Sequence, residues 1–275
     1  MIINGVRTVV RSAGPADERE AVVFVHGNPG SSADWEPLLS VAGMRAVAWD
    51  APGFGQADKP DDFPQTVDAH AAFIGAALNA LGIERAHLVL HDFGGPWGLA
   101  WAASAPERLA SVTLMNTGLL LGYRWHWLAR LWRTRGAGEL FMATTTRPGF
   151  RMLVRRGNPR GLPADFVDAM YDDFDAGTRR AVLRLYRSYD DPAGDAERLA
   201  VALREVDVPA LVLWGRHDPY LSHTLALRQR EVFPTARCVV LPESGHWPYA
   251  DDPGRVAHEL RAFLRSARPA PFARA

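Results

Sequence analysis

An aspartate stands where an apolar segment of the chain stops and two glycines follow. Residues 88–99 read LVLHDFGGPWGL, with Asp92 between the apolar run and Gly94-Gly95. This order is typical of a strand that turns sharply into a helix and projects the residue at the turn into an active site. Serine is the usual occupant, whereas an ionised carboxylate favours attack on a saturated carbon, which forms an ester. Taken alone, Asp92 could equally cap the helix that follows.

Two further loops carry residues that would complete a catalytic set. Asp218 follows the apolar run LVLW, and His246 lies between Gly245 and Trp247 after the last apolar run. Each has a plain structural alternative, because Asp-Pro starts turns and a loop histidine can simply be solvated. The order nucleophile, acid, histidine is nevertheless that of an α/β-hydrolase triad. We therefore predict that Asp92, Asp218 and His246 are the catalytic residues.

The elements that must position these residues are short apolar segments that alternate with helical patterns. The segments lack the two-residue alternation of half-exposed strands, which is typical of parallel strands buried on both faces. We expect an α/β fold with helices on both faces of the sheet. The predicted strands are Ala21–His26, Arg45–Trp49, Ala86–Leu90, Ser111–Met115, Ala210–Trp214 and Ala236–Leu241, and the predicted helices are Thr66–Leu81, Pro96–Ser104, Leu221–Val232 and Gly254–Ala267.

The alternation stops between about Thr117 and Glu205, in a stretch rich in arginine and aromatic residues. Its patterns are helical and contain no convincing strand. We predict a helical cap at residues 119–205, inserted into an α/β-hydrolase core formed by residues 1–118 and 206–275. The aromatic side chains could fill the cap's own small core or line a pocket above the strand ends.

Composition limits the classes of partner. The formal net charge is +0, with 48% hydrophobic and 23% charged residues, so neither nucleic acid nor a membrane is an expected partner. The single cysteine, Cys238, rules out an internal disulfide and fits a cytoplasmic protein. No signal peptide or transmembrane run is evident. We expect no metal and no cofactor, and a monomer or a homodimer.

Four short motifs carry a family resemblance. Over nearly its full length, the chain resembles the aspartate-nucleophile branch of the α/β-hydrolase superfamily, which includes epoxide hydrolases, haloalkane dehalogenases and fluoroacetate dehalogenases. The resemblance implies an eight-stranded, mostly parallel sheet with a cap after the sixth strand. It also implies that the backbone N–H groups of Asn28 and Phe93 stabilise an oxyanion. The motifs are HG-x-P at His26–Pro29, HD-x-GG at His91–Gly95, G-x-x-D at Gly215–Asp218 and GH at Gly245-His246.

The predicted enzyme is a hydrolase with two chemical steps. Asp92 attacks an sp³ carbon of an apolar small-molecule substrate and forms an alkyl-enzyme ester. His246, oriented by Asp218, then activates the water that hydrolyses this ester. Some dehalogenases carry their acid at the position of Asn116, but an amide cannot offset the imidazolium charge, so Asp218 is the predicted acid.

The leaving group divides the possible activities. An epoxide needs an acid that protonates the alkoxide formed on ring opening. The candidate acid is Tyr186, which resembles a cap tyrosine of epoxide hydrolases, and Tyr123 or His126 could be a second donor. A halide needs N–H donors, and Asn28 resembles the halide-binding amide of dehalogenases.

The residue after the nucleophile separates these two readings. Dehalogenases usually carry a tryptophan there, whose indole N–H binds the halide. The side chain of Phe93 has no hydrogen-bond donor, so the indole of Trp125 or Trp127 would have to supply one. We predict an epoxide hydrolase. A haloalkane or haloacid dehalogenase, a lactone or ester hydrolase, and a non-catalytic small-ligand receptor remain as alternatives.

Overall fold

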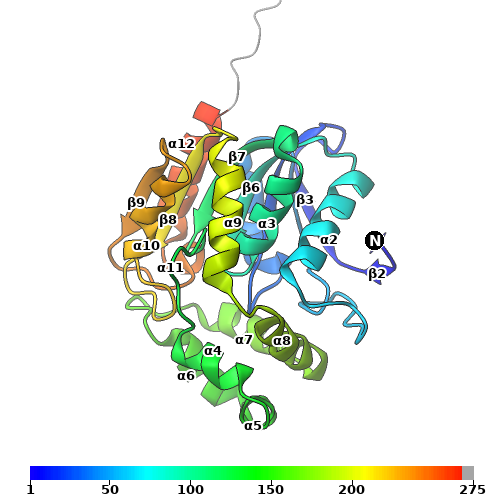
Figure 1. The fold of residues 1–275 in the computed structure, drawn as a ribbon, viewed down its shortest axis with the longest axis vertical. Coiled ribbons are helices and arrows are strands. Elements are labelled where there is room, and N and C mark those ends of the chain that lie inside the picture. Colours follow the sequence, from blue (N-terminus) through cyan, green and yellow to red (C-terminus); the bar gives the residue numbers. More distant parts are fainter. Residues whose placement is uncertain (268–275) are drawn as a thin grey trace, which may run out of the picture.

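Seven strands form one large sheet in the computed structural model, which describes residues 1–267 (Figure 1). Their order is β3-β5-β4-β6-β7-β8-β9; β3 runs antiparallel to β5, and all other neighbours are parallel. All six predicted strands are present to within two residues. β3 was not predicted, because its sequence VRSA is short and only partly buried. The strands are β3 (Val10–Ala13), β4 (Glu20–Val25), β5 (Ala46–Trp49), β6 (Arg85–His91), β7 (Leu109–Met115), β8 (Ala210–Gly215) and β9 (Arg237–Leu241).

The number of strands differs from the eight that the family resemblance implied. Near the N-terminus, β1 (Ile2–Ile3) and β2 (Val6–Arg7) pair with each other in a separate two-stranded sheet. Asn4 and Gly5 join them with positive φ angles of 47° and 81°, as a tight hairpin turn requires. The first residues therefore fold back on themselves instead of extending the large sheet. The cap helices follow β7, the fifth strand of the large sheet in chain order.

Helices cover both faces of the sheet (Figure 1). On one face α2 contacts α3 and α3 contacts α9, whereas α12 packs against β7 and β8. The predicted helices are present, although the segment from Leu221 shortens to α10 and a 3₁₀ turn. The helices of the core are α1 (Glu36–Leu39), α2 (Val67–Ala80), α3 (Gly94–Ser104), α10 (Thr224–Arg228), α11 (Pro248–Asp251) and α12 (Pro253–Ala267), with 3₁₀ turns at Ser32–Trp35, Ser40–Ala42, Pro106–Arg108 and Gln229–Glu231.

The predicted cap region contains helices joined by loops, and no strand. Five of its helices, α4 to α8, gather at one end of the molecule, and α9 runs back along α3 (Figure 1). The boundaries 119–205 stay a prediction, and within them α9 packs on the core. The helices are α4 (Trp127–Arg133), α5 (Ala137–Thr144), α6 (Arg147–Arg155), α7 (Ala164–Asp172), α8 (Ala176–Ser188) and α9 (Pro192–Arg204).

The central strands form the hydrophobic core. Every residue of β7 and β8 is buried, as are all but the first residues of β4 and β6. Burial on both faces explains why these segments read as continuous apolar runs. Within residues 1–267, no helix is long and apolar enough to cross a membrane.

Candidate active site

Asp92 lies in the sharp turn between β6 and α3. Its φ is +48°, a left-handed conformation that is uncommon for an aspartate and is found where a turn holds a functional side chain. Thr117 Oγ1 and the Gly95 N–H both donate to the Asp92 carbonyl oxygen, over 2.6 and 2.9 Å. A Cβ on Gly94 would lie 2.3 Å from the Val25 carbonyl oxygen, so only glycine fits there. The sequence therefore builds a tight elbow with Asp92 at its tip.

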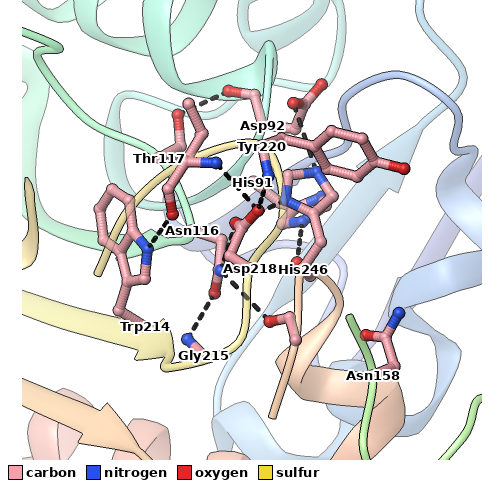
Figure 2. Close-up of polar contacts among 12 residues, drawn as sticks. His91, Asp92, Asn116, Thr117, Asn158, Trp214, Gly215, Asp218, Tyr220 and His246 are labelled. Carbon is pink, nitrogen blue, oxygen red and sulfur yellow. Dashed lines mark hydrogen bonds and ion pairs between the residues drawn. The ribbon is translucent and has the colours of Figure 1, made fainter. Parts of the chain in front are cut away.

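The structure brings the three predicted triad residues together from the ends of three strands (Figure 2). His246, in the loop after β9, places Nε2 3.4 Å from Asp92 Oδ2. Its Nδ1 donates to Asp218 Oδ2 over 2.8 Å. The His246 side chain is only 2% exposed and the Asp218 side chain is fully buried. The imidazole is thus held between two carboxylates in a site with little water.

Asn116 supports the acid of this set from the end of β7. Its Nδ2 donates to Asp218 Oδ2 over 2.6 Å, and its Oδ1 accepts from the Gly215 N–H over 2.9 Å (Figure 2). The other carboxylate oxygen, Oδ1, accepts from the N–H groups of Tyr220 and Leu221. Asn116, set aside as the acid on its sequence, thus donates a hydrogen bond to the predicted acid, Asp218.

Two further hydrogen bonds hold the loop that carries His246. His91 Nε2 donates to the His246 carbonyl oxygen over 2.8 Å, and the Gly245 N–H donates to Asp251 Oδ2 over 2.7 Å. The His91 ring is buried, and burial lowers its pKa to about 3, so the ring is neutral. Its Nδ1 is therefore free to accept from the Tyr249 hydroxyl at 3.4 Å.

The charges in the site are strongly coupled. Burial lowers the pKa of His246, but the charges and hydrogen bonds of Asp218 and Asp92 outweigh it and raise that pKa to about 10. For Asp92, burial acts to raise the pKa, but the hydrogen bond and charge of His246 dominate and lower it. The resting site therefore holds an ionised Asp92 beside a protonated His246.

Asn28, one of the two residues predicted to stabilise an oxyanion, lies in the loop after β4. Its backbone N–H donates to Asp92 Oδ1 over 2.8 Å. Its side-chain amide is buried, and neither Oδ1 nor Nδ2 has a hydrogen-bond partner. Phe93 follows Asp92 at the start of α3, with its backbone nitrogen next to Gly27.

Two cavities meet at Asp92. The leaving-group candidates Tyr186 and His126 line both, whereas Tyr123 and Trp125 line only the second. Trp127, the other tryptophan candidate, is 46% exposed and lines neither cavity. His126 caps α4, so Trp127 is its first residue, and the buried face of the helix begins at Leu128.

Tyr220 is a site residue that the sequence reasoning missed. It lines both cavities, and its ring centroid lies 5.1 Å from those of His246 and His126. Figure 2 places it beside Asp92 and His246. Its position two residues after Asp218 was a signal, since the loop that carries the acid also borders the pocket. Among residues 1–267, no three His, Cys, Asp or Glu side chains come together as a metal site.

The alpha/beta hydrolase fold family matches residues 20–253 of this chain. A 2-hydroxy-6-oxononadienedioate/2-hydroxy-6-oxononatrienedioate hydrolase from Paraburkholderia phymatum is 27% identical, covering 90% of this chain and 87% of that protein. Haloalkane dehalogenase 2 from Mycobacterium tuberculosis is 29% identical, covering 86% of this chain and 85% of that protein. The crystal structure of Cfl2 from Burkholderia cenocepacia superposes with a TM-score of 0.84 at 25% identity, covering 96% and 94% of the two chains. The chain therefore belongs to the α/β-hydrolase family and is an enzyme of the hydrolase and dehalogenase type.

Proposed function

We propose that Asp92 is a nucleophile that attacks an sp³ carbon and forms an alkyl-enzyme ester. The observation that carries this proposal is an ionised carboxylate at the tip of the elbow, with His246 Nε2 3.4 Å away. A carboxylate needs no base to become nucleophilic. An attack on an ester or amide would produce only an anhydride, so a saturated electrophilic carbon is the suitable target.

His246 serves in the second step, the hydrolysis of that ester. While Asp92 is ionised, two carboxylates hold the pKa of His246 high. Alkylation makes Asp92 neutral and removes one of these charges, so the pKa of His246 falls and the ring releases its proton to the solvent. The neutral ring can then accept a proton from the attacking water, and it takes up a proton from the solvent again when the Asp92 carboxylate is restored. Asp218 stays ionised and stabilises the imidazolium that forms. The Asn28 and Phe93 N–H groups would then donate to the oxyanion on the former carboxylate.

The leaving group that fits best is the oxygen of an epoxide. Ring opening creates an alkoxide, which needs a proton. Burial raises the pKa of Tyr186 well above 10, so its phenol stays protonated beside Asp92. Burial lowers the pKa of His126 to about 4, so its ring is neutral. Because the Ala129 N–H donates to His126 Nδ1 over 3.1 Å, the proton of the ring is on Nε2. Tyr186 would supply the proton, and His126 a second hydrogen bond.

The steps balance as the addition of one water to one epoxide. Asp92 forms a bond to a ring carbon while the carbon–oxygen bond of the ring breaks, and Tyr186 protonates the alkoxide. Water then adds to the ester carbonyl, with one proton passing through His246 to the departing alcohol. The second proton of the water restores Tyr186, and Asp92 returns as a carboxylate that carries one oxygen from water.

Hydrolytic dehalogenation is the second candidate. Its specific support is the Asn28 amide, a buried N–H donor without a partner on the wall of the first cavity. The indole N–H of Trp125, buried and without a partner, borders the second cavity. A halide is a weak base and needs such donors rather than an acid. The relative from Mycobacterium tuberculosis that is called a haloalkane dehalogenase adds to this support.

Isotope labelling tests the covalent step. A single turnover with excess enzyme in H₂¹⁸O is expected to place the label in the peptide that contains Asp92 and not in the product alcohol. Label in the alcohol during that first turnover would mean direct attack by water and would overturn the proposal. A panel of neutral epoxides and haloalkanes identifies the leaving group, because halide release well above diol formation selects the dehalogenase.

A further inference from the structure

We propose that the substrate is an uncharged internal epoxide, with an apolar arm on each of the two ring carbons. This inference rests on the proposed function and narrows it to a substrate class. It follows from how the two cavities divide the space around Asp92. We call them the cap cavity, whose wall includes Asn28 and His246, and the core cavity, whose wall includes Phe93 and Thr117.

The two cavities have separate walls. Helices α4, α5 and α6 supply six of the sixteen residues that line the cap cavity, including Trp132, Phe141 and Leu153. The core cavity lies between the segment after β7, with Leu120, and the start of α9, with Ala196. In Figure 1 α4 to α6 lie at one end of the molecule, while α9 runs along α3. The cavities therefore extend from Asp92 toward different parts of the molecule.

The two cavities share the proposed nucleophile and the proposed leaving-group donors. Among residues 1–267, Asp92, His126, Tyr186 and Tyr220 are the residues that line both. A carbon attacked by Asp92 therefore lies where the cavities join. An internal epoxide can place one arm in each cavity, whereas a terminal epoxide leaves one cavity without apolar contacts.

The arms must be uncharged. Within the described residues 1–267, neither cavity is lined by lysine, arginine or glutamate, and Asp92 is the only aspartate in either wall. A carboxylate or ammonium group at the far end of an arm, away from Asp92 and His246, would be buried there without a partner of opposite charge, which is strongly unfavourable. The aromatic and aliphatic walls fit hydrocarbon arms instead.

A matched pair of variants tests whether the substrate places one arm in each cavity. Leu153→Trp narrows the cap cavity and Leu120→Trp narrows the core cavity; both leucines are partly buried wall residues. The substrates are the isomers 4,5-epoxyoctane and 1,2-epoxyoctane, assayed by diol formation. We expect each variant to lower kcat/KM for the internal isomer by roughly tenfold or more. At least one of them should keep the terminal isomer within about threefold of the unchanged enzyme, which also shows that this variant folds. Leu140→Trp, at an exposed leucine outside both walls, is the control and should leave kcat/KM for both isomers unchanged.

The outcomes separate the two proposals. If one variant impairs both isomers and the other impairs neither, a single cavity binds the substrate and the two-armed inference is wrong. The same holds if the unchanged enzyme hydrolyses the terminal isomer but not the internal one, although the proposed function then stands. Leu153→Phe and Leu120→Phe repeat the comparison with a smaller change if a tryptophan variant fails to fold. If neither isomer yields diol and no label reaches Asp92, the proposed function itself has failed.

Discussion

The Asn116 amide donates to Asp218 Oδ2 over 2.6 Å, at the same oxygen that accepts from His246. Asn116 is buried at the end of β7 with φ at +46°, so the strand end itself aims this donor. Two donors on one oxygen hold the carboxylate in a single orientation. The relationship makes Asn116 a positioning residue for the acid.

Asn116→Asp is expected to make stability depend on pH. The new carboxylate would lie beside Asp218, and two carboxylates at this distance cannot both ionise, so one pKa rises well above its usual range. The folded protein then holds a proton that the unfolded chain releases, so stability falls as pH rises. We expect the Tm of the variant to be lowered more at pH 8 than at pH 5. At pH 8 the free energy of unfolding should fall by about 1–3 kcal/mol. Asn4→Asp, at an exposed asparagine with φ +47°, is the matched control, and equal losses of Tm at both pH values would contradict the idea.

His246→Gln is expected to separate the two chemical steps. The variant keeps Asp92 but lacks the base for ester hydrolysis, so the alkyl-enzyme should accumulate. Intact-protein mass spectrometry after incubation with a reactive epoxide should detect an increase equal to the mass of the substrate, located on the peptide with Asp92. The double variant with Asp92→Asn should form no adduct. Full turnover by the His246→Gln variant would contradict the proposed mechanism.

The sequence was sufficient for most of the sheet and for the residues at its strand ends. Buried parallel strands are continuous apolar runs, and the loops after them carry Asp92, Asp218 and His246, which the fold then brings within hydrogen-bonding distance. The chain order of the three residues carried that prediction, because each one alone fitted an ordinary cap or turn.

The lining of the pocket was much harder to predict. Trp127 and His126 are neighbours, yet Trp127 is 46% exposed and His126 lines both cavities, because His126 caps α4. A side chain's direction at a helix start depends on that cap, which the aromatic composition of the cap region does not reveal. The supporting role of Asn116 depends on a contact across 102 positions of the chain, which no local pattern encodes.

Tyr186→Phe is expected to distinguish an epoxide from a halide as the leaving group. Loss of the phenolic proton removes the acid for the alkoxide, so kcat for epoxide opening should fall by roughly 10²–10⁴-fold. Halide release from a haloalkane should fall by less than about tenfold, since a halide needs no proton. Tyr171→Phe, in the cap but outside both cavities, is the matched control. An equal loss with both substrates would mean that Tyr186 only shapes the pocket.

Asp34→Asn is expected to flatten the pH dependence of stability. Burial, with the neighbouring Asp173 and Asp50, raises the pKa of Asp34 to about 8, although hydrogen bonds from Ser31 and Tyr249 act against this. The folded protein therefore holds a proton between about pH 4 and pH 8 that the unfolded chain releases, and its stability falls as pH rises through that window. Asparagine stays neutral and can still accept from the Ser31 N–H.

For Asp34→Asn, the Tm difference, variant minus unchanged protein, should therefore increase from pH 5 to pH 9, by about 2–4 °C for each kcal/mol of relieved charge burial. Calorimetry across this range measures the difference directly. Asp61→Asn, at a largely exposed side chain, is the control and should leave the pH profile of Tm unchanged. Parallel Tm profiles for Asp34→Asn and the unchanged protein would show that Asp34 is ionised in the folded state, with its charge stabilised by the Ser31 N–H and the Tyr249 hydroxyl.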